Sequence, residues 1–344
     1  MKKENRHINI PVFIPHLGCP NQCVFCNQRF ISGTQEFNIS KVRSLIESAL
    51  STIGENTTAQ IAFFGGSFTG IDLGLMRELL EMSESYIKAG KVESIRLSTR
   101  PDYISEEILD ILSEYHVTTI ELGIQSVSDE VLLLSKRGHS FSQIAEACDM
   151  ITKRKFELVG QMMIGLPGGN LENEIETAQK ICEMGADGAR IYPTVTFYDT
   201  ELSKMAERGE YAMLSLEDAI VRSKEVLKVF RKEGVECIRI GLCASDNLGD
   251  ESKVMGGANH PALGELVMGE LYYDEMREFL LKAANRCALK DKNIQILVPT
   301  GQLSKAIGQS GKNRERLLAE FEMKSLKIVE NIWTLGLTMF ELDE

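Results

Sequence analysis

Two patterns of apolar residues alternate along residues 1–235. Short apolar runs rich in β-branched residues predict buried strands, and longer stretches with apolar residues three or four positions apart predict amphipathic helices. Strands of this kind, each followed by a helix, predict a parallel sheet that helices cover. Because parallel crossovers share one hand, six repeats predict an α/β fold in the form of a partial (β/α)6 barrel of the TIM type. The expected strands are Ile8–Leu17, Gln60–Gly65, Ser94–Thr99, Thr119–Gln125, Leu158–Gly165 and Ala189–Thr196, and the expected helices are Ser40–Ile53, Leu73–Ala89, Ser105–Tyr115, Phe141–Lys153 and Leu171–Met184.

The pattern changes after a helix expected at Leu216–Lys232. The last segments have a strand–helix–helix–strand order, which predicts a small α+β domain at the end of the chain. We therefore expect a barrel over residues 1–235, an extension with connecting helices over 236–287 and the small domain over 288–344. The expected elements are a short strand at Glu236–Leu242, a loop at Asp246–His260, helices at Ala262–Leu271 and Tyr273–Arg286, and then Ile294–Pro299, Gln302–Ile307, Asn313–Phe321 and Lys324–Asn331.

The composition is that of an ordinary globular protein. Hydrophobic residues make up 43% and charged residues 26% of the 344 positions, so a sizeable core is expected. No apolar run reaches the roughly 20 residues that a membrane span needs, and residues 1–7 lack the apolar segment of a signal peptide. We therefore expect a cytoplasmic protein with no membrane partner. The net charge of −12 argues against a surface that is basic throughout, but it is compatible with a local basic patch.

Three of the eight cysteines stand close together. Cys19, Cys23 and Cys26 follow the first expected strand, whereas the other five are scattered and are expected to be mostly small buried residues. Disulfides are not expected in a cytoplasmic chain. Three thiolates on one loop indicate a metal centre, either zinc or an iron–sulfur cluster. Structural zinc needs four ligands, for which His16 is the candidate fourth, whereas three cysteines leave one iron of a cubane cluster open.

The spacing C-x3-C-x-aromatic-C after a first strand resembles the signature of the radical S-adenosylmethionine (SAM) superfamily, with Phe25 in the aromatic position. The resemblance implies that the three cysteines hold a [4Fe–4S] cluster and that SAM binds its open iron. In that family one electron cleaves SAM to methionine and a 5′-deoxyadenosyl radical, and the aromatic residue packs near the adenine. The reductant that the resemblance implies is a one-electron donor such as flavodoxin or ferredoxin.

Residues near the carboxyl ends of the later strands also resemble the family. Gly65, Gly66 and Ser67 match the Gly-Gly motif whose strand edge binds the SAM amino group, and glycine there permits a close approach. Ser98 departs from the pattern, because many relatives have a carboxylate at that position to recognise the ribose. The resemblance adds Ser98, Arg100, Gln125, Arg137 and Gln161 to the expected SAM site, with Arg137 pairing with the SAM carboxylate.

Over Pro15–Tyr211, and again over Gly256–Val267, the chain resembles the radical SAM part of the Elongator catalytic subunit and its short bacterial homologues. Coproporphyrinogen-oxidase-like proteins are the next most similar. The Elongator subunit also has an acetyltransferase domain, for which this chain leaves no room, so acetyl-CoA chemistry is not expected. The resemblance implies an enzyme that modifies RNA.

The end of the chain, around Val298–Asn313, resembles the KH domains of the transcription factor NusA. In a KH domain, a G-x-x-G loop lets a nucleic-acid phosphate approach backbone amides at a helix N-terminus. Between Arg286 and Arg316, seven basic residues outnumber two acidic ones, which gives a local charge of +5. RNA is therefore the expected partner, and a KH-like fold used only for packing is the alternative. The expected RNA contacts are Lys305, Gly308, Gln309, Ser310, Gly311, Lys312 and Arg314.

These features together predict a radical SAM enzyme that modifies a nucleotide of tRNA or rRNA. Two alternatives stay open at this point. The first is a radical SAM enzyme for a small, porphyrin-like molecule, which the salt sensitivity of RNA affinity would distinguish. The second is a non-catalytic RNA-binding protein stabilised by a metal, which iron and sulfide analysis would distinguish.

Overall fold

The computed structural model divides the chain into two compact units. Unit 1 comprises Met1–Ser215 and Val226–Asn259, and unit 2 comprises Leu216–Glu225 and His260–Glu344. The three-part division expected from the sequence stays a prediction. The residues that the structure describes are 6–14, 17–19, 23–27, 37–54, 57–242, 252–286, 288–332 and 336–341.

Unit 1 is built on a parallel sheet of seven strands in the order β1-β2-β3-β4-β5-β6-β8. The expected α/β partial barrel is confirmed, and β8 adds a further strand at the edge. Because every neighbouring pair of strands is parallel, all the carboxyl ends lie at one edge of the sheet, where barrels of this kind place their chemistry. The strands are β1 (Arg6–Phe13), β2 (Thr57–Phe64), β3 (Ser94–Thr99), β4 (Val117–Gln125), β5 (Glu157–Ile164), β6 (Gly188–Pro193) and β8 (Glu236–Ile240).

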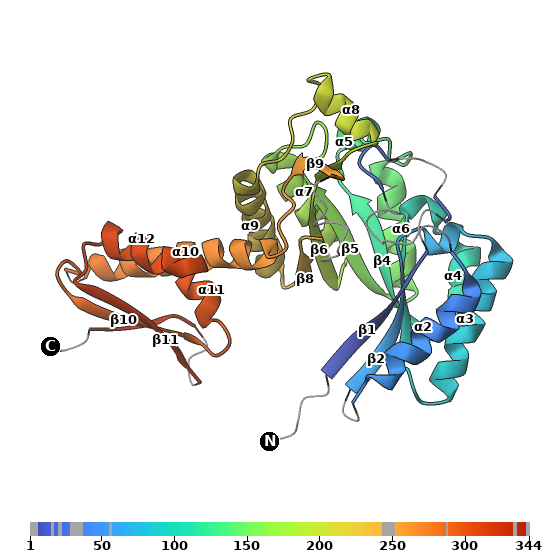
Figure 1. Ribbon diagram of the computed structural model, residues 1–344, viewed down its shortest axis with the longest axis horizontal. Helices are drawn as coiled ribbons and strands as arrows, with labels where there is room; N and C mark the ends of the chain where they lie inside the picture. Colours follow the sequence, from blue (N-terminus) through green and yellow to red (C-terminus); the bar gives the residue numbers. More distant parts are fainter. Residues whose placement is uncertain are drawn as a thin grey trace. The chain divides into compact units, whose positions relative to one another are not determined.

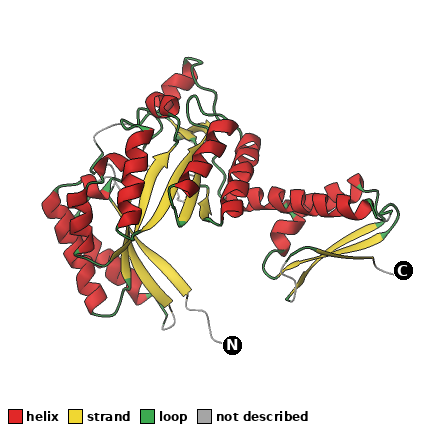
Figure 2. Cartoon of the chain, turned by 180° about the vertical axis from the view of Figure 1, so that it is seen from behind, coloured by secondary structure: helices red, strands yellow, loops and turns green. Residues whose placement is uncertain are grey.

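Helices pack against the sheet of unit 1, and α2, α3 and α4 lie side by side along β1–β3 (Figures 1 and 2). Several begin at a residue whose side chain accepts a hydrogen bond from the first turn, such as Asp72 from the Leu75 amide and Ser105 from the Ile108 amide. The helices are α2 (Ile39–Ser51), α3 (Leu73–Lys88), α4 (Glu106–Ser113), α5 (Asp129–Leu134), α6 (Phe141–Lys153), α7 (Leu171–Glu183) and α8 (Glu201–Glu207), with short 3-10 turns at Phe68–Gly70 and Pro101–Tyr103. Helix α9 (Leu216–Glu233) belongs to unit 1 only from Val226 onward.

One expected strand and one expected loop are wrong. The strand expected at Ala189–Thr196 ends at Pro193, and β7 (Val195–Phe197) leaves the sheet to pair with β9 (Val254–Gly257). Proline has no amide hydrogen to continue the ladder, which favours a break there. The β9 segment was expected to be a loop, because its glycines are typical of a turn. Its pairing with β7 joins residues far apart in the sequence, and the local pattern does not predict it. Gly257 has a φ of +100° and packs so close to Thr194 that an added Cβ would lie 2.8 Å from the Thr194 carbonyl oxygen.

Unit 2 packs two short helices and a long one against a sheet in the order β11-β10-β12. Residues expected to form two helices form a single helix α10 (Leu263–Ala284), because neither glycine nor proline separates Leu271 from Tyr273. A short strand, β12 (Thr338–Glu341), pairs antiparallel with β10 and was not expected. The other elements are β10 (Asn293–Pro299), α11 (Leu303–Ile307), α12 (Lys312–Glu320) and β11 (Ser325–Asn331).

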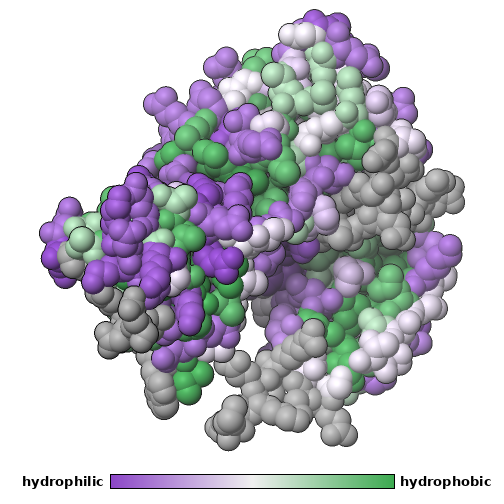
Figure 3. All heavy atoms as spheres, turned by 60° about the vertical axis from the view of Figure 1, so that its left-hand side comes forward, coloured by the Kyte–Doolittle hydropathy of each residue, from purple (hydrophilic) through white to green (hydrophobic). Residues whose placement is uncertain are grey.

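The core of unit 2 lies between its helices and its sheet. Tyr272, Met276 and Leu280 of α10 are buried in one cluster with apolar residues of β10 and β11. Figure 2 shows the helices on one face of the three-stranded sheet, and in Figure 3 hydrophilic side chains cover much of the visible surface of this unit. In the part of the chain that the structure describes, no helix is long and apolar enough to cross a membrane.

Candidate functional site

The cysteine loop, defined here as residues 17–27, follows β1 at the carboxyl edge of the sheet. The described parts are residues 17–19 and 23–27, and His16, the candidate fourth zinc ligand, lies outside the described residues. Two helices hold this loop through its backbone. The Val24 amide donates to the Ser135 carbonyl at 3.2 Å, and the Leu202 amide of α8 donates to the Val24 carbonyl at 2.8 Å. The Cys26 amide donates to the Cys23 carbonyl at 3.0 Å, which forms a tight turn between two of the thiols.

The chemistry of this loop fits a cluster held by cysteine thiolates. Among the described residues, no three His, Cys, Asp or Glu side chains lie close enough together to hold one metal ion. A single zinc ion would need all its protein ligands within about 2.3 Å of the metal, whereas the thiolates of a cubane cluster bind different irons and are spaced more widely. Cys23 is buried, and Cys19 and Cys26 are half-buried, so all three thiols are at least partly shielded from solvent.

Two buried arginines, Arg100 and Arg137, converge on Cys23, and we call them the arginine pair. Arg137 Nη1 donates to Cys23 Sγ at 3.2 Å, and Arg100 Nη1 lies 3.9 Å from the same sulfur. Arg137 Nη2 donates to the Gly123 carbonyl at 2.7 Å, and Arg100 donates to the Arg137 carbonyl, which links the two. Guanidinium groups placed against a ligating sulfur complement an anionic metal centre, so this cationic surrounding fits a thiolate-held cluster.

Asp102 holds Arg100 in place. Its two carboxylate oxygens accept from Arg100 Nε and Nη2, both at 2.9 Å, and His139 Nδ1 lies 3.4 Å from Asp102 Oδ1. Burial raises the pKa of Asp102, but contacts with His139 and Arg100 outweigh it and hold that pKa well below its ordinary value. Burial lowers the pKa of His139 below its ordinary value. Burial also lowers the pKa of Arg100, but the hydrogen bond to Asp102 reverses this, and the pKa of Arg100 is raised.

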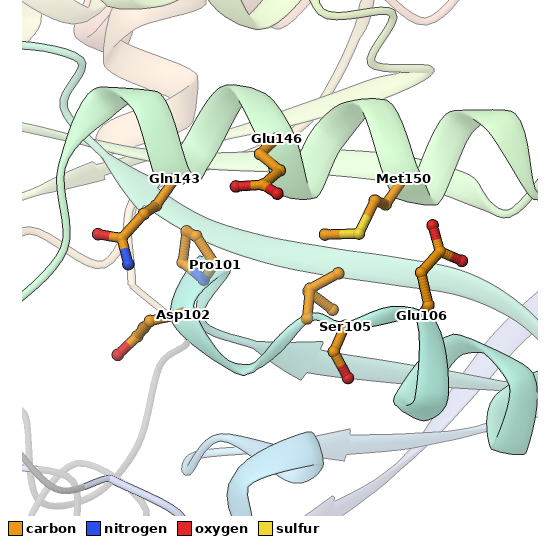
Figure 4. Close-up of a pocket in the computed structure, with 8 residues that line it drawn as sticks. Pro101, Asp102, Ser105, Glu106, Gln143, Glu146 and Met150 are labelled. Atoms are coloured by element: carbon orange, nitrogen blue, oxygen red, sulfur yellow. The ribbon is translucent and has the colours of Figure 1, made fainter.

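A cavity of about 310 Å³ lies on the other side of Asp102, between α6 and the segment that follows β3. Gln143, Glu146 and Met150 point from α6 toward this segment (Figure 4). Asp102, Glu106 and Glu146 line the cavity together with the apolar residues Pro101, Ile104 and Met150. Asp102 is therefore shared between this cavity and the arginine pair.

The Gly-Gly segment after β2 supports the cysteine loop directly. A Cβ added at Gly66 would lie 2.2 Å from the Leu17 carbonyl oxygen and 2.5 Å from the Ile14 carbonyl oxygen. The Ser67 amide donates to the Leu17 carbonyl at 3.0 Å, and Ser67 Oγ lies 3.5 Å from Cys19 Sγ. Glycine is therefore required at position 66 by the chain's own backbone. A SAM contact at Gly65, Gly66 and Ser67 stays a prediction.

Gly66→Ala is expected to lower the iron content of the anaerobically purified protein, because the new methyl group displaces the backbone of Ile14 and Leu17 and with it nearby Cys19. The measurement is iron per chain, together with circular dichroism to check folding. Gly54→Ala is the matched control, since nothing lies within 4 Å of a Cβ at Gly54. Equal iron content in the two variants would show that the backbone contact at Gly66 is not needed for the loop.

The remaining residues expected to contact SAM lie on four elements. Gln125, at the end of β4, is buried, has a φ of +67°, and its Oε1 has no hydrogen-bond partner among the described residues. A left-handed conformation at a non-glycine residue costs of order 1–3 kcal/mol and is typical of functional sites. Ser98 Oγ donates to the Phe63 carbonyl at 3.3 Å, and Phe25 is half-buried in the cysteine loop. Gln161 Nε2 donates to Glu121 at 3.1 Å and so belongs to a polar cluster on the sheet.

With Gln161 on β5, that cluster joins four neighbouring strands, and the sequence analysis missed its charged residues. Glu121 on β4 is fully buried and accepts from Arg96 on β3 at 2.9 Å and from Arg190 on β6 at 2.8 Å. All three residues stand inside runs expected to be buried parallel strands, where charged side chains are rare. Charged residues within such runs were the signal that could have identified the cluster.

Glu121→Ala is expected to lower the free energy of unfolding by about 3–5 kcal/mol, because it leaves two buried guanidinium groups without their shared carboxylate. Chemical denaturation followed by circular dichroism measures the change. Glu114→Ala removes an exposed carboxylate paired with Arg77 and is expected to have an effect of less than about 1 kcal/mol. Similar effects of the two substitutions would contradict the structural role given to Glu121.

Three further cysteines are described, and burial is the largest cause of a raised pKa in each. The pKa of Cys148 rises to about 12, and those of Cys182 and Cys237 rise to about 11. Thiols of this kind are poor metal ligands at neutral pH because they stay protonated. Cys243 and Cys287 lie outside the described residues.

The glycine loop of unit 2 joins α11 to α12. Gly308, Ser310 and Gly311 have φ values of +77°, +54° and +82°, so two of the three left-handed positions are glycines. Buried Asn313 fixes the loop, since its Nδ2 donates to the Gly269 carbonyl of α10 at 2.7 Å and to the Ala306 carbonyl at 3.3 Å. The sequence analysis did not assign Asn313 a role. Of the expected RNA contacts, Gln309, Ser310, Lys312 and Arg314 are exposed, and Lys305, Gly308 and Gly311 are half-buried.

Comparison with protein families decides the class of this chain. A radical SAM superfamily model matches residues 13–181, and a radical SAM C-terminal domain model matches residues 186–273. The uncharacterized protein MJ0486 of Methanocaldococcus jannaschii is 30% identical over 227 residues, which are 62% of this chain and 69% of that protein. The chain belongs to the radical SAM superfamily. Members of this superfamily use a [4Fe–4S] cluster and SAM, and this radical SAM protein is an enzyme.

Other radical SAM relatives have longer chains. The tRNA uridine(34) acetyltransferase of Methanocaldococcus infernus is 30% identical over 174 residues, which are 50% of this chain and 32% of that protein. A solved structure of the archaeal Methanocaldococcus infernus Elp3 with an N-terminal deletion superposes with a TM-score of 0.61 at 21% identity, covering 83% of this chain and 65% of that one. The structural likeness shows a shared fold. This radical SAM chain thus spans about a third of the acetyltransferase that it resembles.

Proposed function

We propose that this enzyme reductively cleaves SAM at a [4Fe–4S] cluster held by Cys19, Cys23 and Cys26, and that the 5′-deoxyadenosyl radical modifies a nucleotide of tRNA or rRNA. The observation that carries the proposal is the arrangement around Cys23. Two buried guanidinium groups reach one thiol of a three-cysteine loop at the carboxyl edge of a partial barrel. This cationic surrounding complements the negative charge of a metal centre that cysteine sulfurs hold.

The chain's own residues position the reactants. The cluster, when bound, supplies the electron that breaks a carbon–sulfur bond of SAM. Helices α5 and α8 fix the cysteine loop through the Val24 backbone, and Ser67 holds its start. Gln125 has a buried oxygen with no partner among the described residues, so it is available to accept a hydrogen bond from SAM. Phe25, Ser98, Arg100, Arg137 and Gln161 complete the proposed SAM site, with flavodoxin or ferredoxin as the proposed reductant.

The RNA part of the proposal concerns the glycine loop of unit 2, which we propose to be a KH-like RNA-binding domain. Exposed Gln309 and Ser310 leave the backbone open to solvent at the start of α12, where helix amides favour a phosphate. Lys312 and Arg314 on the first turns of α12 are exposed and can neutralise neighbouring phosphates. Names of relatives with tRNA uridine(34) acetyltransferase activity support an RNA substrate, whereas acetyl transfer is not part of the proposal.

The test begins with protein purified without oxygen. About four irons and four sulfides per chain are expected, and dithionite with SAM should yield 5′-deoxyadenosine. Stoichiometric zinc without deoxyadenosine would contradict the cluster. For the substrate, modified nucleosides in tRNA and rRNA are compared between a deletion strain and its parent. An unchanged nucleoside profile would favour a small-molecule substrate over RNA.

A further inference from the structure

The buried charges at Cys23 have a second consequence, which concerns electron transfer. We infer that the arginine pair, with Asp102 as the positioning residue for Arg100, raises the reduction potential of the metal centre that Cys23 holds. The inference rests on the proposed function, because it requires a [4Fe–4S] cluster at Cys19, Cys23 and Cys26. It gives Arg100 and Arg137, which the sequence placed at the SAM site, a second role in setting the reduction potential.

The contacts go to the cysteine sulfur itself. Arg137 Nη1 lies 3.2 Å from Cys23 Sγ, and Nη2 lies 2.7 Å from the Gly123 carbonyl oxygen. Hydrogen bonds from both terminal nitrogens therefore fix the orientation of the guanidinium group. Arg100 approaches the same sulfur at 3.9 Å. Hydrogen bonds to ligating sulfurs and nearby charge are the levers by which proteins set cluster potentials.

The sign follows from the charges. Arg100 and Arg137 each carry +1 and Asp102 carries −1, so the group is cationic by one unit. Reduction adds one electron to the cluster and makes it more negative, and a neighbouring positive charge stabilises the reduced form. The arginines are 4% and 6% exposed, so solvent screens this interaction little. The reduction potential is therefore higher with the pair than without it.

Asp102 determines where the Arg100 charge lies. The bidentate contact, with two distances of 2.9 Å, fixes the plane of the guanidinium group, and the bond from Arg100 to the Arg137 carbonyl ties it to its neighbour. A lysine at position 100 keeps the charge but cannot make this two-point contact. Arg100→Lys therefore separates positioning from charge.

The experiment is a redox titration monitored by electron paramagnetic resonance, without SAM, on wild type and on Arg137→Gln, Arg137→Lys, Arg100→Gln and Arg100→Lys. Both glutamine variants should make one-electron reduction at least about tenfold less favourable, which corresponds to a fall of about 59 mV. Arg137→Lys should stay near wild type, and Arg100→Lys should fall between wild type and Arg100→Gln. Arg77→Gln, an exposed arginine paired with Glu114, is the control and should leave the potential unchanged.

Each other outcome is decisive. If the glutamine variants keep four irons and titrate at the wild-type potential, the inference is wrong. If Arg137→Gln titrates at the wild-type potential and a separate binding measurement shows a lower affinity for SAM, Arg137 binds the SAM carboxylate and does not set the potential. If both glutamine variants lose their iron, the pair holds the cluster and the inference is also wrong. Wild-type protein without iron would instead contradict the proposed function, so the two failures are distinguishable.

Discussion

Replacing Cys23 with alanine is expected to remove nearly all of the roughly four irons per chain that a [4Fe–4S] protein binds. Two thiolates do not retain a cubane cluster well. The substitution also removes the sulfur that Arg137 donates to in a buried site, where an unmade hydrogen bond from a charged group is unfavourable. Formation of 5′-deoxyadenosine from SAM and dithionite should fall to background. Iron and sulfide analysis and chromatography of the reaction products measure the two effects.

Cys148→Ala is the matched control for this experiment. Cys148 is fully buried in α6, its thiol has a pKa raised to about 12, and its side chain is as small as that of Cys23. Any general effect of removing a buried thiol should appear in this variant, whereas the iron content should not change. Wild-type iron content and cleavage in Cys23→Ala would show that the cluster is held elsewhere.

Replacing Gln309-Ser310 with Asp-Asp is expected to weaken RNA binding by at least about tenfold, because two carboxylates then face the phosphate that the glycine loop is proposed to bind. Both side chains are exposed, and Ser310 has a left-handed φ of +54°, a conformation that aspartate tolerates. The fold of unit 2 should therefore survive. SAM cleavage without RNA should stay close to wild type, because no residue of the cysteine loop is changed.

The control for the loop is Gln309→Asn with Ser310→Asn, which keeps the loop polar, neutral and compatible with the left-handed conformation. Fluorescence anisotropy with labelled tRNA, measured at several salt concentrations, gives the affinities. Wild type and the Asn-Asn variant should lose affinity steeply as salt rises, since each phosphate contact releases a counterion. Equal binding by Asp-Asp and wild type would make unit 2 a structural domain and would favour a small-molecule substrate.

Motifs within a few residues of each other were predictable, and contacts between distant residues were not. The spacing of Cys19, Cys23 and Cys26 identified the loop, but the contact of Arg137 with Cys23 spans 114 positions and left no local pattern. Arg137 was expected at the SAM carboxylate, and in this structure its guanidinium group is bound to the cysteine sulfur and the Gly123 carbonyl. Asp102 and His139 lie two positions after Arg100 and Arg137, which the sequence placed at the SAM site. Their own roles depend on contacts of Asp102 with Arg100 and His139 that form only in the folded protein.

The sequence by itself determined the fold class and the strands of the parallel sheet up to β6, because apolar periodicity and glycine turns act over a few neighbouring residues. It therefore predicted the parallel barrel, the cysteine loop and the glycine loop of unit 2. Three contacts were decided by tertiary structure alone. They are the packing of Gly66 against the Leu17 backbone, the pairing of β7 with β9, and the hydrogen bond from Asn313 to the Gly269 carbonyl. Those contacts join segments that are far apart in the sequence, and no local sequence pattern predicts them. They form only when the strands and helices pack together in the complete fold.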